Sequence, residues 1–372
     1  MPNAQSSKKK LMLSPIKVLL VEDSPVATIV LKRIFDSSPE IKVVGTACNG
    51  LEALELIPTL QPEVICTDLN MALMNGLEFT KEVMKKYPLP ILVISASVQA
   101  DDTQNVFELL KAGALDVFPK PIGGLASDYD RLANQLIAKI KILSGVKVFT
   151  RHQKSVKTED TNKNVKINAV PVPNYQFSQA NLKYPTIKVL AIGASTGGPQ
   201  ALYTIISQLP ANFPVPVICV QHISEGFLQG LVDWLASESK MPVKIAAFGE
   251  YPQAGTVYFP PEKRHLELDY KGRFVYSEVA DVGGYCPSVT VTFKSVANFY
   301  RRGAAGVLLT GMGRDGADGM LAIAKLGGLT IAQDEASSVV FGMPKEAIAL
   351  GAVQHILPIS AIAPLLLAQL KI

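Results

Sequence analysis

The feature that most constrains this fold is a repeated alternation of short β-branched runs with longer amphipathic runs. The strand-like runs of the first half are 17–21, 41–47, 64–67, 91–94 and 115–118. The helix-like runs between and after them are 25–35, 50–60, 77–86, 102–112 and 128–143. Short strands that alternate with helices are typical of a parallel sheet with helices on both faces. We therefore predict a doubly wound α/β domain of the (βα)5 type.

The same alternation returns from residue 186 onward. The strand-like runs there are 187–192, 215–221, 243–248, 305–310 and 330–333. The helix-like runs are 200–208, 225–238, 288–300, 316–326 and 344–350. Between 256 and 276 short alternating runs indicate a β-hairpin insertion. The predicted fold class is therefore α/β with two doubly wound parallel-sheet domains, the second of them Rossmann-like with a β-hairpin insertion.

The stretch between the two halves has a different composition. Residues 145–184 are rich in Lys, Asn, Gln and Thr and show no clear period, which favours a flexible basic linker. We therefore expect one domain over 16–143, a linker over 144–185 and a second domain over 186–372. The whole chain has a net charge of only +4, which is too small to indicate a nucleic-acid-binding face.

The cysteines and the apolar runs predict a cytoplasmic protein. The four cysteines lie far apart, and Cys48, Cys66 and Cys219 sit in or beside apolar runs, so we expect buried, reduced thiols. The first ten residues are polar and carry no signal-peptide pattern. No uninterrupted apolar stretch reaches the roughly 18 residues of a membrane span, so membrane insertion is not expected.

Polar side chains follow four of the five predicted strands of the first half. Glu22 and Asp23 follow the first, Asp68 the third, Ser95 the fourth and Lys120 the fifth. Because the carboxyl ends of parallel strands meet at one edge, these groups should converge there. Three converging carboxylates need a cation, and oxygen ligands suit Mg²⁺. The lysine and the serine could bind phosphoryl oxygens beside Asp68.

This half of the chain resembles the receiver domain of response regulators. The resemblance is carried by Val21–Pro25 (VEDSP), Asp68–Gly76 (DLNMALMNG), Ser95–Ala96 and Lys120–Pro121. It implies that Asp68 is the phosphorylated residue and that Ser95 and Lys120 form the switch pair. It also implies a Mg²⁺ site made by Glu22, Asp23, Asp68 and the backbone carbonyl of Asn70.

The second half opens with a strand followed by a glycine turn. Gly193-Ala-Ser195-Thr-Gly197 fits the G-x-S-x-G elbow, which exposes a serine hydroxyl above a sheet. The competing interpretation, a dinucleotide-binding turn, requires G-x-G-x-x-G and an acidic residue about 20 positions later. Ser195 occupies the second glycine position, and the next strand ends in Gln221-His222. A nucleophilic serine is therefore the favoured interpretation.

A serine nucleophile needs a base and a group that orients the base. His222 ends the next predicted strand, so it should share an edge with Ser195. Asp315 ends another buried strand in a glycine turn, and either an orienting acid or a helix N-cap fits that position. The other histidines are His152 in the linker, His265 at the hairpin, with a substrate-side or structural role, and His355 near the C-terminus.

These residues resemble the CheB family of chemotaxis protein-glutamate methylesterases. The resemblance is carried by the segments 193–199, 220–223, 260–265, 286–289, 309–316 and 334–344. It implies hydrolysis of glutamate methyl esters on chemoreceptors, with possible glutamine deamidation, by Ser195, His222 and Asp315. The oxyanion would be bound by the backbone N–H groups of Thr196 and Met312, and the esterase half would use no cofactor.

The resemblance also implies a mode of control. The receiver would cover the esterase cleft until a chemotaxis histidine kinase provides the phosphoryl group for Asp68. Two alternatives stay open: a phosphorylation-controlled esterase with another substrate, and a catalytically silent signalling scaffold.

Overall fold

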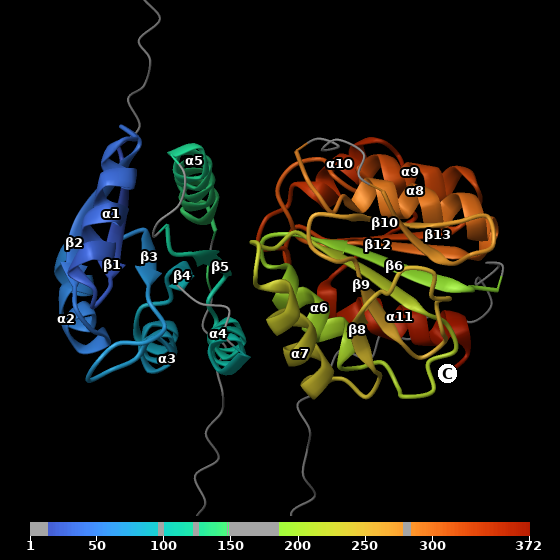
Figure 1. Cartoon of the computed structure of the whole chain (residues 1–372), viewed down its shortest axis with the longest axis horizontal. Helices are drawn as coiled ribbons and strands as arrows, with labels where there is room; N and C mark the ends of the chain where they lie inside the picture. The colour runs from blue at the N-terminus through green and yellow to red at the C-terminus, as the bar shows by residue number, and fades with distance from the viewer. Residues whose placement is uncertain (1–13, 96–99, 122–125, 147, 149–185, 278–283) are drawn as a thin grey trace, which may run out of the picture. The chain divides into compact units, whose positions relative to one another are not determined.

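The computed structural model describes residues 14–95, 100–121, 126–146, 148, 186–277 and 284–372. The chain divides into two compact units, which are Met1–Ala96 with Phe118–Val148, and Ser97–Val117 with Phe149–Ile372. Two parallel sheets dominate the structure (Figure 1). Most of the predicted linker lies outside the described residues, and the predicted domain boundaries stay a prediction.

The first sheet has the strand order β2-β1-β3-β4-β5. Its strands are β1 (Ile16–Val21), β2 (Ile41–Ala47), β3 (Val64–Thr67), β4 (Ile91–Ser95) and β5 (Asp116–Pro119). The helices are α1 (Pro25–Asp36), α2 (Gly50–Leu60), α3 (Gly76–Lys86), α4 (Ala100–Ala112) and α5 (Ala126–Leu143). Strands β3 and β4 are buried along their whole length, as expected for a parallel sheet with both faces covered.

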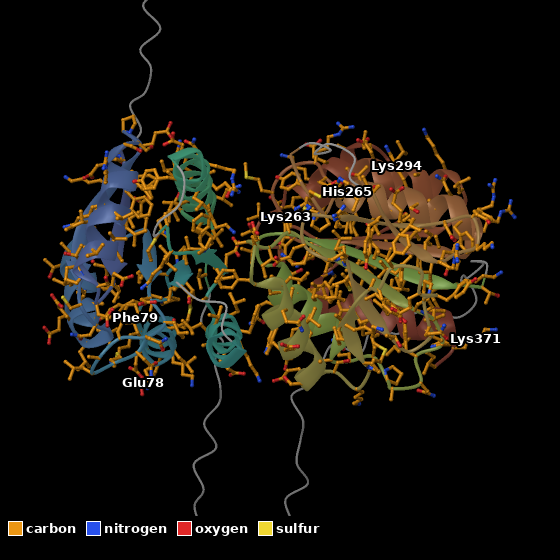
Figure 2. All side chains as sticks on the ribbon, in the orientation of Figure 1. Glu78, Phe79, Lys263, His265, Lys294 and Lys371 are labelled. Carbon is orange, nitrogen blue, oxygen red and sulfur yellow. The ribbon has the colours of Figure 1, made fainter. Side chains whose placement is uncertain are left out.

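Local sequence explains where these helices begin. Ser24 caps α1 by accepting a hydrogen bond from the Ala27 N–H. Asn75 and Glu78 form a reciprocal capping box at the start of α3. The next residue, Phe79, is fully buried while Glu78 is exposed, so α3 is amphipathic from its first turn (Figure 2). Three residues separate β1 from α1, whereas a loop of eight residues separates β3 from α3.

The second sheet has the strand order β14-β13-β12-β6-β7-β9-β8, and its strand pairs are parallel. Its strands are β6 (Val189–Ala194), β7 (Val217–Gln221), β8 (Val243–Ile245), β9 (Val257–Phe259), β12 (Ala304–Leu308), β13 (Leu329–Gln333) and β14 (His355–Leu357). The helices are α6 (Gly198–Ile206), α7 (Leu228–Glu238), α8 (Val289–Tyr300), α9 (Ala317–Lys325), α10 (Met343–Ala349) and α11 (Ile359–Leu370). Helices α8, α9 and α10 lie on one face, and α6, α7 and α11 lie on the other (Figure 1).

The predicted fold class is confirmed, with differences in detail. The hairpin is formed by β10 (His265–Leu268) and β11 (Phe274–Ser277), which pair antiparallel. The start of the region predicted as hairpin is β9, which instead joins the main sheet between β7 and β8. Strand β14 was not predicted, because a three-residue strand carries too little pattern to be recognised. Helix α11 was not predicted either, and it contains a proline, Pro364, which is unusual inside a helix.

The cysteines differ from expectation at one position. Cys66 and Cys219 are buried, and burial raises the pKa of both thiols. Cys48 is exposed, so its predicted burial is wrong. It lies just after Ala47, the buried last residue of β2, and so outside the strand. None of the four cysteines forms a disulfide bond. Among the described residues there is no helix that is both long and apolar enough to cross a membrane.

Candidate active site

The first sheet gathers three carboxylates at the carboxyl ends of its strands. Oxygen atoms of Glu22, Asp23 and Asp68 lie within 4.8 Å of one another. Lys120 Nζ donates to Glu22 Oε1 at 2.9 Å and to Asp68 Oδ2 at 2.5 Å. Burial is the main cause that raises the pKa of both of these carboxyls, although the hydrogen bonds from Lys120 oppose it. One ammonium group therefore faces three crowded carboxylates.

These residues fit a divalent metal ion. The set consists of carboxylate oxygens, which Mg²⁺ prefers. Glu22 Oε2 is buried and has no hydrogen-bond partner among the described residues, and Asp23 is exposed to solvent. Asn70 lies two residues after Asp68, and its predicted role as a backbone ligand stays a prediction.

Two backbone contacts fix the segments around Asp68 and Lys120. Ser95 accepts a hydrogen bond at its carbonyl from the Lys120 N–H at 2.9 Å, which ties the ends of β4 and β5 together. Gly76 packs so tightly that a Cβ atom there would lie 2.2 Å from the Asp68 carbonyl oxygen. The switch role of Ser95 and Lys120 stays a prediction.

In the second sheet, Ser195 follows β6 at the start of a tight turn. Gly197 has φ +76°, which favours glycine, and it precedes helix α6. The Ser195 N–H donates to the Thr310 carbonyl at 3.0 Å, so the turn is fixed to the end of the neighbouring strand β12. A Cβ atom on Gly311 would lie 2.7 Å from Ser195 Cβ, so only glycine allows these two loops to meet.

His222 follows β7, the other neighbour of β6. Its N–H donates to the Ala194 carbonyl at 3.0 Å, which places it beside the serine turn. Its Nε2 lies 2.9 Å from Asp315 Oδ2. Because Asp315 accepts the Nε2 proton, the unprotonated nitrogen is Nδ1, which is buried and has no partner among the described residues. The free basic atom of this pair is therefore Nδ1.

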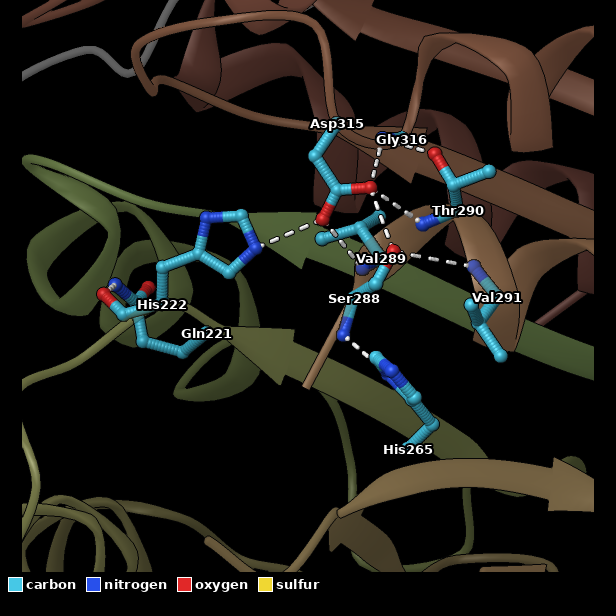
Figure 3. Close-up of polar contacts among 9 residues, drawn as sticks. All are labelled: Gln221, His222, His265, Ser288, Val289, Thr290, Val291, Asp315 and Gly316. Carbon is cyan, nitrogen blue, oxygen red and sulfur yellow. Dashed lines mark hydrogen bonds and ion pairs between the residues drawn. The ribbon is translucent and has the colours of Figure 1, made fainter. Parts of the chain in front are cut away.

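The carboxylate of Asp315 is held by the N-terminus of α8 (Figure 3). Oδ1 accepts from Ser288 Oγ at 2.8 Å and from the Thr290 N–H at 2.9 Å, and Oδ2 accepts from the Val289 N–H at 2.7 Å. Burial alone would raise the pKa of Asp315. The hydrogen bonds from His222 and Thr290 outweigh burial and hold the pKa well below its usual range.

Asp315 is thus more than the helix cap that its sequence position also allowed. Helix α9 is preceded by Gly316 and has no side-chain cap, so Asp315 serves the neighbouring helix α8 and His222 instead. The helix N-terminus offers several N–H donors and a favourable dipole to a carboxylate. The arrangement is that of an acid that stays ionised and orients an imidazole.

Two glutamines that sequence reasoning overlooked support the site. Gln221 Nε2 donates to the carbonyls of Ser195 at 2.8 Å and His222 at 2.7 Å, so one amide bridges both turns. Gln333 Oε1 accepts from the Thr310 N–H at 2.8 Å. A polar residue at the end of an otherwise apolar buried strand is the signal that could have indicated them.

The remaining predicted groups lie as follows. Thr196 is buried and Met312 is 47% exposed, and neither backbone N–H donates a hydrogen bond within the part of the chain that the structure describes.

His265 is fully buried, and its Nδ1 accepts from the Ser288 N–H at 3.0 Å, so its role is structural. Its imidazole thereby supports the α8 N-terminus. His355 is half-buried, and burial lowers its pKa.

Comparison with known proteins covers both halves of the chain. The family model for the response regulator receiver domain matches residues 18–126, and that for CheB methylesterase matches 190–366. A protein-glutamate methylesterase/protein-glutamine glutaminase of Syntrophus aciditrophicus (strain SB) is 41% identical over 94% of this chain and 97% of its own. Its counterpart in Nitrosospira multiformis is 39% identical over 94% of this chain and 95% of its own.

A solved structure is similar to the second half. The CheB methylesterase catalytic domain of Thermotoga maritima is 38% identical and covers 49% of this chain and 98% of its own, with a TM-score of 0.48. The curated relatives match almost end to end, across both the receiver and the methylesterase regions. The chain therefore belongs to the CheB family of protein-glutamate methylesterases with an N-terminal receiver domain.

Proposed function

We propose that this chain hydrolyses glutamate methyl esters on chemoreceptors and also acts on glutamine side-chain amides. The family supports this activity, because its members are named for both reactions. The observation that carries the chemistry is the His222–Asp315 pair, whose unpaired Nδ1 lies at the strand end next to that of Ser195. Ser195 is the proposed nucleophile, His222 the general base and Asp315 the orienting acid.

In the first step, Ser195 Oγ attacks the ester carbonyl carbon while His222 Nδ1 takes its proton. The negative charge that develops on the carbonyl oxygen is bound by the N–H groups of Thr196 and Met312, which have no other partner within the described chain. His222 then gives its proton to the methoxy oxygen, and methanol leaves. Ser195 is now esterified to the glutamyl group.

In the second step, a water molecule gives a proton to His222 and attacks the same carbonyl carbon. The tetrahedral intermediate breaks down as His222 returns the proton to Ser195 Oγ, which releases glutamate. Asp315 accepts the Nε2–H throughout and stabilises the imidazolium in both steps. With a glutamine substrate the leaving group is ammonia instead of methanol.

The receiver is proposed to regulate this reaction. Asp68 would accept a phosphoryl group from a chemotaxis histidine kinase, and Glu22, Asp23, Asp68 and the Asn70 carbonyl would hold Mg²⁺. The ion supplies positive charge to the phosphoryl oxygens when bound. The hydrogen bond from Lys120 to Asp68 supports a role for this lysine in binding the phosphoryl group, and Lys120 and Ser95 would form the switch pair that responds to phosphorylation. A cytoplasmic location is supported by the four cysteines, which form no disulfide bond.

The test is methanol release from membranes that carry methylated chemoreceptors. Wild type, Ser195→Ala and Asp68→Asn would each be measured with and without acetyl phosphate and Mg²⁺. We expect release that requires Ser195 and rises on phosphorylation only when Asp68 is present. Folded, phosphorylated wild type that releases no methanol from receptors would refute the proposed substrate. Hydrolysis of other esters would then favour an esterase with a different substrate. If no ester were hydrolysed, a catalytically silent signalling scaffold would be favoured.

A further inference from the structure

The imidazole of His222 is covered on one face by a tyrosine. The rings of His222 and Tyr285 are stacked with centroids 4.2 Å apart and planes only 5° from parallel. Tyr285 is half-buried and lies three residues before Ser288, the cap of α8 that also donates to Asp315. The segment 285–288 therefore provides both a hydrogen-bond donor to Asp315 and an aromatic surface that packs against His222.

This stack restricts the orientation of the imidazole. The hydrogen bond to Asp315 fixes the direction of Nε2 but leaves the ring free to rock about that axis. A parallel aromatic face removes this remaining freedom and so determines where Nδ1 points. The tyrosine itself fits closely, because a Cβ atom on Gly313 would lie 3.3 Å from its hydroxyl oxygen.

The tyrosine ring also suits the charge that forms on His222. An imidazolium formed during the reaction would lie over a ring face, where cations are attracted. Burial and the charge of Asp315 raise the pKa of Tyr285, so its hydroxyl stays neutral around neutral pH. A neutral aromatic ring can cover the imidazole without competing for its Nδ1 proton site.

We propose that Tyr285 is a positioning residue that holds the plane of the His222 imidazole and stabilises its protonated form. The inference rests on the proposed esterase function, although the stack can be tested without activity. Because the aromatic face is responsible, phenylalanine should replace the tyrosine and leucine should not. The hydroxyl group contributes little in this account.

The experiment compares Tyr285→Phe and Tyr285→Leu with Tyr270→Leu, a control at a tyrosine that is 83% exposed. Methanol release should show kcat lowered roughly 2- to 30-fold in Tyr285→Leu, the range expected for loss of a cation–π contact. KM should stay near the wild-type value, and the Phe variant should keep wild-type kcat. Wild-type kcat in Tyr285→Leu, or a Phe variant as slow as the Leu variant, would overturn the proposal.

Proton NMR provides a readout that does not depend on catalysis. A ring stacked on His222 shifts its carbon-bound ring protons upfield, and the chain has only four histidines, so His222→Gln assigns the signals. We expect the shift in wild type and Tyr285→Phe and its loss in Tyr285→Leu. Wild-type protein without the shift would overturn the stack even if the Leu variant fails to fold. The shift present without any esterase activity would refute the proposed function but not the stack.

Discussion

Replacing Gly311 with alanine would place a methyl group between the two loops that meet at Ser195. The added carbon would lie 2.7 Å from Ser195 Cβ and 2.3 Å from Met343 Sδ. The Gly311 N–H donates to the Val340 carbonyl, and its own carbonyl accepts from Gly342 and Met343, so the glycine cannot easily retreat. The serine turn should therefore move.

The size of the effect follows from these distances. An ordinary carbon–carbon contact is about 3.5 Å, so Ser195 must shift by about 0.8 Å. A displacement near 1 Å costs on the order of 100-fold in rate, so we expect kcat to fall about 10- to 100-fold. Overpacking should lower the free energy of unfolding by about 1–3 kcal/mol, which should leave the protein folded.

The matched control is Gly303→Ala, at the other end of β12. A Cβ atom there would lie 3.1 Å from the flexible side chain of the exposed Lys188, so little should change. Methanol release under single-turnover conditions measures the rate, and urea unfolding measures stability. If folded Gly311→Ala were as active as Gly303→Ala, the close approach of Gly311 to Ser195 would not be what positions the serine.

Four further predictions follow from contacts described above. Asp315→Asn should lower kcat by about 10⁴-fold in methanol release, because the amide favours the wrong imidazole tautomer; activity near wild type would exclude the orienting role. The pKa of Asp315 lies below its unfolded-state value of 3.8, so the ionised carboxylate stabilises the fold above pH 3.8. The free energy of unfolding in urea should therefore fall as the pH drops below 3.8, and this fall should be smaller in Asp315→Asn. Gln221→Leu should cost roughly 1–3 kcal/mol in urea unfolding for each carbonyl that it leaves unpaired; a change typical of a surface site would contradict the bridge. Gly76→Ala should slow phosphorylation by acetyl phosphate because it displaces the Asp68 carbonyl, whereas Gly145→Ala, with its nearest contact at 3.6 Å, should not; equal rates would argue against this packing role.

The sequence predicted which groups would be close because parallel strands end at a common edge. Ser195 and His222 follow strands that turned out to be neighbours, β6 and β7, and Glu22 and Asp68 follow β1 and β3. In each case a short motif identified the residue type, and the topology of an α/β sheet supplied the proximity. The common edge of the sheet was enough to predict this proximity, without knowledge of the strand order.

Other features depend on contacts between distant segments and could not be read locally. Asp315 is held by the start of α8, some 26 residues earlier, so the local pattern left the helix-cap alternative open. His222 contacts Asp315 through Nε2 across a separation of 93 residues, so the local sequence does not indicate which ring nitrogen is used. The role of Tyr285 likewise arises only when the segment before α8 packs on His222.

The proposed mechanism depends on Ser195 as the nucleophile and on His222 as the base that activates it. A fluorophosphonate ester, which forms a stable tetrahedral adduct with activated serines, would be incubated with wild type, Ser195→Ala and His222→Gln, and the labelled peptide would be identified by mass spectrometry. We expect one rapid adduct on Ser195, none in Ser195→Ala, and strongly slowed labelling in His222→Gln. An adduct on a different residue, or labelling of Ser195 at an unchanged rate without His222, would contradict it.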